Sequence, residues 1–295
     1  MAVVQELTGE EPPLGGALGP GESGRVILAD NLQVLRSLPD GCIDLVYVDP
    51  PFGTGRVRRL DSIRTGSGEL RRRGFGGKEY RFQVVSHHSF PDSLHRDAYL
   101  EFLHQRLVEI HRVLQPQGSL YLHLDFRVSH YARLLLDEIF GAERFLNEII
   151  WAYDYGGRAR DRWPRKHDTI LWYAKSDRWT FNRTEIDRIP YMAPGLVGPE
   201  KAARGKLPTD TWWLTIVPTR GQERAGYPTQ KPLSLLERIV RASSREGELV
   251  ADFFCGSGTT GVAAAAVGRR FLLVDDNPEA IAITRQRLGL EPLPG

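Results

Sequence analysis

The sequence predicts an α/β fold in which an open, doubly wound and mostly parallel sheet carries an inserted irregular lobe. Two observations predict this class. Short apolar runs of strand length alternate with segments whose apolar residues recur at helical spacing. A late run, at 249–254, leads into a glycine-rich turn and a helix, whereas an early run, at 43–48, ends on Asp49 and two prolines. A glycine-turn unit placed last is typical of a circularly permuted doubly wound domain.

The composition is that of a folded protein. The chain has 295 residues, of which 41% are hydrophobic and 26% charged, so it can bury a substantial core and is not a disordered chain. Two cysteines exclude a disulfide scaffold and a four-cysteine zinc site, and we expect no metal. No apolar run approaches the ~20 residues of a membrane span and no signal peptide is recognisable, so we expect a cytoplasmic protein.

The elements follow one another in a regular order after a first stretch, 1–24, that is rich in glycine and proline and is interpreted as a flexible N-terminal extension. Periodicity then predicts strands at 25–28, 43–48, 119–124, 148–153 and 169–173, with helices at 31–38, 97–114 and 128–140. Pro50 and Pro51 end the second strand. Residues 53–95, rich in glycine, serine and arginine, predict a long, mobile basic loop.

The second half begins irregularly and ends regularly. Residues 156–166 are strongly basic, and glycine, proline and tryptophan punctuate 181–227, which predicts a lobe outside the main sheet. A helix at 233–243 introduces the last unit. This unit consists of a buried strand at 249–254, a glycine turn, an alanine-rich helix to about 267, and a strand at 271–274.

The glycine turn at 255–261 is the first indication of chemistry. Glycines adopt positive φ and let a ligand approach the backbone, and free N–H groups at a helix start attract electron-rich atoms. Asp275 ends the next strand, where a carboxylate accepts hydrogen bonds from ribose hydroxyls. The unit therefore predicts a cofactor that contains a nucleoside.

Two other interpretations of this turn are weaker. Gly256, Gly258 and Gly261 spell the dinucleotide-binding fingerprint, but only 20 residues follow Asp275, too few to complete a dinucleotide domain downstream. A turn that serves packing alone would make the motif at Asp49 a coincidence.

Three motifs in a fixed order carry a resemblance to a known family. Residues 252–260 (Asp-Phe-Phe-Cys-Gly-Ser-Gly-Thr-Thr), 49–52 (Asp-Pro-Pro-Phe) and 227–233 (Tyr-Pro-Thr-Gln-Lys-Pro-Leu) together resemble the beta-group amino-methyltransferases of DNA. The resemblance covers about 25–290 and departs at Phe253, where many relatives have proline. It implies a Rossmann-like methyltransferase fold with a catalytic half (25–155), a target-recognition region (156–226) and a cofactor-binding half (227–295).

The resemblance also implies the reaction, a methyl transfer from S-adenosylmethionine to an exocyclic amine of a base in double-stranded DNA, by in-line displacement with base flipping. Asp49 and the rigid Pro50 carbonyl, with Pro51 beside it, would accept the amine hydrogens, and Phe52 would stack on the extruded base. Asp49 favours adenine, because serine commonly stands first in cytosine-amine enzymes of this family. Cytosine N4 is the alternative. Methylation at ring carbon five needs a differently placed cysteine.

For the cofactor, the resemblance assigns Asp275 to the ribose hydroxyls, Asp30 to the adenine ring, and Gln230 and Lys231 to the methionine carboxylate. Lys231 as a plain surface lysine is the alternative. The remaining implied contacts come from the glycine turn: Asp252, Phe254, Cys255, Gly256, Ser257, Gly258, Thr259 and Thr260.

DNA contacts are expected from two basic clusters, because phosphate contacts supply affinity and the net charge of the chain is only +2. The clusters are Arg56, Arg58, Arg71, Arg72 and Arg73, and Arg158, Arg160, Arg162, Arg165 and Lys166. Solvated surface faces are the alternative for both. A homodimer and a cognate restriction endonuclease fit the family, although no feature of the sequence establishes either. RNA or protein-glutamine methylation and a catalytically dead DNA-binding module are the competing functions.

Overall fold

The computed structural model describes residues 2–6, 17–19, 21–51, 56–73, 79–92, 96–156, 158–218 and 221–290, and for 3–6, 56–73, 79–92 and Arg96 it describes the main chain alone. The chain divides into two compact units. The larger unit combines 1–50 with 102–295, and the smaller one is 51–101. The prediction that the early and late parts of the sequence form one body is therefore correct.

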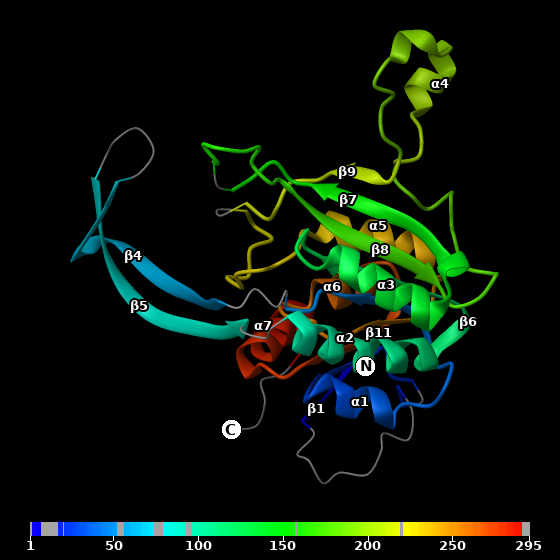
Figure 1. Ribbon diagram of the computed structural model, residues 1–295, viewed down its shortest axis with the longest axis horizontal. Helices are drawn as coiled ribbons and strands as arrows, with labels where there is room; N and C mark the ends of the chain where they lie inside the picture. Colours follow the sequence, from blue (N-terminus) through cyan, green and yellow to red (C-terminus); the bar gives the residue numbers. More distant parts are fainter. Residues whose placement is uncertain are drawn as a thin grey trace. The chain divides into compact units, whose positions relative to one another are not determined.

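The larger unit is built on one sheet (Figure 1), which has nine strands in the described residues. In spatial order these are β1 (Ala2–Glu6), β2 (Gly24–Leu28), β11 (Arg270–Asp275), β10 (Leu249–Asp252), β3 (Ile43–Val48), β6 (Leu114–Leu124), β8 (His167–Ala174), β7 (Phe145–Ala152) and β9 (Thr211–Trp213). Only the pairs of β8 with β6 and with β7 are antiparallel. The predicted mostly parallel, permuted α/β class is confirmed.

Helices cover the sheet because its central strands are apolar on both faces. Five of the six residues of β3 are buried, as expected of a strand within a parallel sheet. Leu45 and Tyr47 pack in one cluster with side chains of the last three helices, and Val46 and Val48 point to the other face.

The helices of the described residues are α1 (Asn31–Ser37), α2 (Arg96–Val113), α3 (Ser129–Phe140), α4 (Pro199–Arg204), α5 (Leu233–Ser243), α6 (Thr259–Ala266) and α7 (Pro278–Leu288), with 3-10 turns η2 (Ala142–Arg144) and η3 (Pro194–Leu196). None of these helices is both long and apolar enough to cross a membrane.

Elements with strong periodicity lie where they were predicted. β3 and α5 have the predicted bounds, and α5 buries Leu235, Leu236, Ile239 and Val240 along one face. Other boundaries move by a few residues, as in β6, which begins five residues before the predicted strand. Pro232 precedes α5 in an extended conformation, where proline is well tolerated.

Three predictions about irregular segments are wrong in part. The N-terminal extension includes β1, because Ala2–Glu6 find an unpaired edge at β2 and join it in parallel. The expected lobe at 181–227 includes β9, which pairs with β7 through Thr211–Trp213 and forms the edge of the sheet there. In both segments three to five residues complete a sheet edge, and so short a run has no periodicity to recognise.

The expected basic loop at 53–95 is the third difference. The smaller unit contains β4 (Arg56–Arg73) and β5 (Glu79–Asp92), which pair antiparallel from Arg56 opposite Asp92 to Arg73 opposite Glu79. Tyr80, Phe82 and Val84 alternate with polar residues, a strand pattern that the surrounding glycine, serine and arginine obscure. The pairing shifts register between Thr65 and Leu70, so the glycines there are accommodated outside the regular ladder.

Candidate active site

The turn after β10 is fixed by two glycines with positive φ, Gly256 at +50° and Gly258 at +72°. Gly258 also precedes α6 as its N-cap. A Cβ atom at Gly258 would lie 2.6 Å from the Thr284 side chain of α7, and one at Gly261 would lie 2.4 Å from Leu273. The glycines are therefore needed both for the turn and for the close packing of α6 against β11 and α7.

Two buried carboxylates hold this turn from inside. Asp252 accepts hydrogen bonds from the Phe254 N–H at 3.0 Å and from the Thr260 hydroxyl at 2.5 Å. Burial raises the pKa of Asp252 to about 7, against these two hydrogen bonds, and the neighbouring Asp49 and Asp275 raise it further. Asp252 therefore shapes the turn from beneath.

Asp275 lies at the end of β11, where its oxygens accept from the Gly256 N–H at 2.8 Å and the Asn277 N–H at 3.0 Å. Burial raises the pKa of Asp275 to about 6, opposed by these two backbone hydrogen bonds. Each carboxylate oxygen has a second lone pair, so Asp275 retains acceptor capacity for a further donor.

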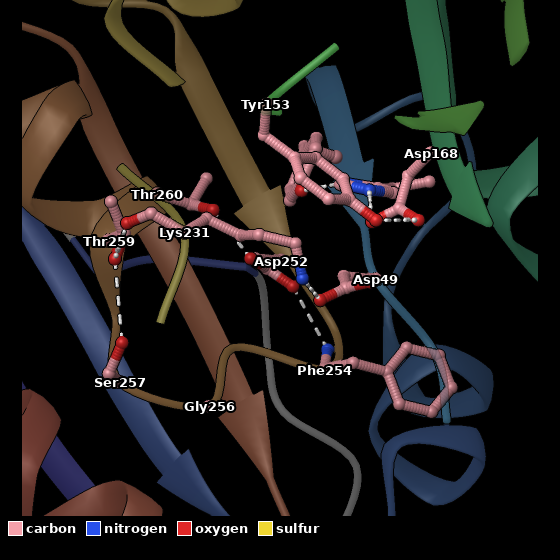
Figure 2. Close-up of polar contacts among 12 residues, drawn as sticks. Asp49, Tyr153, Asp168, Lys231, Asp252, Phe254, Gly256, Ser257, Thr259 and Thr260 are labelled. Carbon is pink, nitrogen blue, oxygen red and sulfur yellow. Dashed lines mark hydrogen bonds and ion pairs between the residues drawn. The ribbon is translucent and has the colours of Figure 1, made fainter. Parts of the chain in front are cut away.

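Asp49 follows β3 and forms an ion pair with Lys231 (Figure 2). Both side chains are largely buried, with 16% and 11% of their surface exposed. The second oxygen of Asp49, Oδ1, is buried and has no hydrogen-bond partner among the described residues. An unpaired buried carboxylate oxygen is costly, and it is an acceptor available to an N–H donor that is not part of the chain.

Lys231 connects Asp49 to the glycine turn. Its ammonium group contacts Asp49, while its carbonyl oxygen accepts a hydrogen bond from the Thr259 hydroxyl at 3.2 Å. β3 and β10 are also neighbours in the sheet. The structure thus brings together the two motifs that lie farthest apart in the sequence, at the carboxyl ends of adjacent strands.

A buried polar network behind Asp49 was not predicted. The Tyr47 hydroxyl lies 2.7 Å from Nδ1 of His123, and Nε2 of His123 lies 3.3 Å from Asp168. The Tyr153 hydroxyl donates to the other oxygen of Asp168 at 3.4 Å. Since a carboxylate only accepts, Nε2 of His123 is the donor to Asp168, and Nδ1 on the other side of the ring faces the Tyr47 hydroxyl. These residues lie on four different strands or strand ends, and no motif in the sequence links them.

Asp168 is kept ionised by this network. Burial alone would raise the pKa of Asp168, but the hydrogen bond from His123 and the charge of Lys231 hold it below its usual value. A second carboxylate therefore lies close enough to Lys231 to act on its charge. Lys231 is placed among carboxylates and not on the open surface.

The other predicted cofactor residues occupy varied positions. Asp30 caps α1 through the Leu32 and Gln33 N–H groups and pairs with Arg106 at 3.1 Å, and the amide of Gln230 binds the main chain of Glu223 and Ala225. Burial raises the pKa of the Cys255 thiol well above its usual value. Further residues that support the turn were not predicted: Asn31 donates to the Phe253 carbonyl, Thr284 to the Gly256 carbonyl, and Arg287 to Ser257 and Thr259.

The remaining catalytic and DNA-binding predictions divide by region. Pro50 is buried beside Asp49, Pro51 begins the smaller unit, and Phe52 lies outside the described residues. Arg56, Arg58, Arg71, Arg72 and Arg73 lie on β4, with side chains outside the description. The second basic cluster lies in the loop between β7 and β8, where the four arginines are exposed and Lys166 is half-buried: Arg158, Arg160, Arg162, Arg165 and Lys166.

Comparisons with known proteins agree on one kind of relative. A family model described as a DNA methylase, of the N6 and N4 type, matches residues 43–286. The Type II methyltransferase M.HpaI of Haemophilus parainfluenzae is 32% identical over 269 residues, which cover 90% of this chain and 74% of that protein. The DNA adenine methyltransferase YhdJ of Escherichia coli (strain K12) is 28% identical over 295 residues, covering 95% of this chain and 86% of that protein.

Solved structures show the same fold. The PvuII DNA methyltransferase, described as cytosine-N4-specific, superposes with a TM-score of 0.63 at 17% identity, covering 93% of this chain and 89% of its own. The complex of M1.HpyAVI with SAM has a TM-score of 0.57 at 20% identity, covering 90% of this chain and all of that one. The predicted Rossmann-like methyltransferase fold is confirmed.

Proposed function

Since this chain belongs to the DNA methylase family that modifies adenine N6 or cytosine N4, with S-adenosylmethionine as methyl donor, we propose that it methylates the 6-amino group of adenine in duplex DNA. The observation that carries this proposal is the buried Oδ1 of Asp49, an acceptor without a partner among the described residues. It lies where the catalytic motif meets the glycine turn.

The residues of the turn fit the methyl donor. Gly256 and Gly258 have no side chains and leave room for a ligand to approach the backbone, while their own N–H groups donate to Asp275 and to the Cys255 carbonyl. Asp275 beside them keeps acceptor capacity for ribose hydroxyls. Asp252, Thr259 and Thr260 fix the turn that carries these groups. When bound, the cofactor supplies a methyl group on a positively charged sulfur.

Asp49 and Pro50 act on the amine. The lone pair of an adenine amine is delocalised into the ring, so the nitrogen is a poor nucleophile until its hydrogens are bound by acceptors. Asp49 Oδ1 accepts one hydrogen and the Pro50 carbonyl accepts the other, which favours a tetrahedral nitrogen aligned for in-line attack. The negative charge of Asp49 also stabilises the positive charge that develops on nitrogen as the new C–N bond forms and the bond between the methyl group and sulfur breaks. The methylated nitrogen then releases one of its two protons.

Lys231 and Asp168 set the electrostatics of this step. The Lys231 ammonium pairs with the other oxygen of Asp49 and so orients the carboxylate. Asp168, itself held by His123 and Tyr153, offsets the charge of Lys231. The site therefore contains more negative than positive side-chain charge, which suits a reaction that creates a cation at the amine.

Adenine is preferred to cytosine because an aspartate, not a serine, stands at position 49. The similarity to an adenine methyltransferase over 95% of the chain supports the same choice. The basic loop between β7 and β8 supplies phosphate contacts, and the target base is extruded to reach Asp49. The proposal requires neither a second copy of the chain nor a cognate restriction endonuclease.

The test is to incubate the protein with duplex DNA and S-adenosylmethionine labelled in its methyl group, digest the DNA to nucleosides and identify the labelled one. We expect N6-methyladenine. Label only in N4-methylcytosine would overturn the choice of base, and label only in RNA or protein supplied in parallel would overturn the choice of DNA. Sequencing DNA from cells with and without the protein then maps the methylated site.

A further inference from the structure

Trp163 is the most exposed aromatic side chain among the described residues, with 92% of its surface accessible. A tryptophan side chain offers a large flat apolar surface, and leaving it in water forgoes the free energy of its burial. Isolated apolar residues on a surface are common, so exposure alone assigns no role. The position and surroundings of Trp163 are what distinguish it.

The loop that carries Trp163 is held at its base. The Tyr153 N–H donates to the Lys166 carbonyl at 3.0 Å, and the Lys166 ammonium donates to the Gly156 carbonyl at 3.0 Å. The Arg165 guanidinium stacks 3.8 Å from the centre of the Phe126 ring. Pro164 restricts the residue before it, Trp163, to extended backbone conformations. The exposed indole is thus presented from an anchored segment.

The loop between β7 and β8 leaves the sheet on the side where β3 ends and the active site lies (Figure 1). β6 runs parallel to β3, and β8 and then β7 reverse direction in turn, so β7 ends and β8 begins where β3 ends at Asp49. Tyr153, the first residue after β7, donates to Asp168 beside Lys231. Trp163 therefore projects from the rim of the catalytic site.

The charge around Trp163 complements DNA. Between 153 and 166 five basic residues stand against two acidic ones. Arg158 and Arg160 are exposed and form no ion pair with any described residue, whereas Arg162 is paired with Asp161 at 2.6 Å. Cations free to bind phosphates thus flank an aromatic face that is free to stack on bases.

We propose that Trp163 enters the duplex beside the target and occupies the position in the base stack that the flipped adenine leaves. This inference rests on the proposed function. A base that turns out to reach Asp49 leaves a gap between its two neighbours, and an indole in that gap recovers part of the lost stacking. Trp163 is on this account a positioning residue that favours the extruded state and does not touch the reacting amine.

The test uses the full chain and a short duplex that contains the mapped methylation site, with 2-aminopurine in place of the target adenine. Fluorescence of 2-aminopurine rises when it leaves the stack. At saturating protein, Trp163→Ala should lose most of this rise and should bind about tenfold more weakly, while Trp163→Phe, which still stacks, should retain most of both. Binding is followed by fluorescence anisotropy.

The matched control is Trp179→Ala. Trp179 is 42% exposed and follows the carboxyl end of β8, which lies at the opposite end of the strands from Asp49. This variant should therefore behave as the wild type. The dependence of affinity on salt separates stacking from loop damage, because Trp163→Ala removes no phosphate contact and should leave the slope of log Kd against log salt unchanged.

Two results would overturn the proposal: an undiminished 2-aminopurine signal in Trp163→Ala, or equal losses in Trp163→Phe and Trp163→Ala together with a reduced salt slope. These outcomes are separate from failure of the proposed function. That failure appears in the wild type as an absence of methyladenine, before any variant is compared.

Discussion

The turn after β10 and the loop between β7 and β8 leave the same edge of the sheet, but they are built in opposite ways. In the turn, all four carboxylate oxygens of Asp252 and Asp275 accept hydrogen bonds from neighbouring groups. In the loop, Arg158, Arg160 and Trp163 extend into solvent. These hydrogen bonds fix the shape of the turn from within the chain, whereas the exposed side chains of the loop are available to another molecule. Substitutions in or beside the turn should therefore abolish methyl transfer or destabilise the fold. Substitutions in the loop should weaken DNA binding by small steps.

The largest expected effect is at Asp49, beside the turn. Asp49→Ala removes the acceptor for the amine and should lower the rate of methyl transfer by about 1,000-fold or more, equivalent to about 4 kcal/mol. Binding of S-adenosylmethionine, measured by calorimetry, should change little, because the turn is intact. A variant with ordinary transfer rates would remove Asp49 from the mechanism, and a parallel loss of cofactor binding would show that the substitution disturbs the turn as well.

The same substitution should lower the free energy of unfolding by unequal amounts at two glycines, one in the turn and one in the loop. Gly258→Ala in the turn combines positive φ with a contact of 2.6 Å to Thr284 and should lower the free energy of unfolding by about 3 kcal/mol. Gly156→Ala in the loop has φ of +104° but no atom within 4 Å, and should cost about 1 kcal/mol from backbone strain alone. Urea unfolding of both variants measures the difference, and equal costs would contradict the contrast in packing.

The buried carboxylates of the turn should also make stability depend on pH. The pKa of Asp252 is raised to about 7 in the folded chain, so between the unfolded value and this one the folded state binds a proton that the unfolded state has lost. The contribution of Asp252 to stability is therefore present at low pH and is lost as pH rises toward about 7. Between about pH 5 and about pH 8, the free energy of unfolding should fall less in Asp252→Asn than in the wild type. The difference between the two falls should be on the order of 2 kcal/mol. A steeper loss of stability in this variant would reverse the assignment.

The smallest effects are expected in the loop. Arg160→Ala should weaken DNA binding a few-fold and lower the magnitude of the salt slope by about 1, as for one lost phosphate contact. Arg178→Ala is the control, because Arg178 is exposed after β8, at the opposite end of the strands from the loop. Anisotropy titrations at several salt concentrations measure both, and an unchanged slope in Arg160→Ala would make this arginine a solvated surface residue.

Periodicity predicted the parts of the fold that bury a continuous apolar surface. β3 and α5 were located residue by residue because each has several apolar residues at a regular spacing. β1 and β9 were missed because short edge strands owe their conformation to a neighbour from another part of the chain. β4 and β5 were missed because composition outweighed the alternation at Tyr80, Phe82 and Val84.

The site shows the same division. Motifs identified Asp49 and the glycine turn, whose chemistry is local in sequence. The network of Tyr47, His123 and Asp168 depends on the spatial order of β3, β6 and β8, which the sequence does not state. The contact of Lys231 with the methionine carboxylate stays a prediction, and its pairing with Asp49, a partner 182 positions away, was not predicted.

The position of β10 in the sheet has a consequence for how the molecule forms on the ribosome. β3 emerges early, yet it is flanked on one side by β10, and the Leu249 N–H binds the side chain of Asp44 across 205 positions. Until that late strand has been synthesised, an apolar strand edge in the first half of the protein has no native neighbour. Contacts of such long sequence separation slow folding and leave the growing chain open to mispairing. We therefore expect β3 to be the strand most exposed to mispairing until β10 has been synthesised.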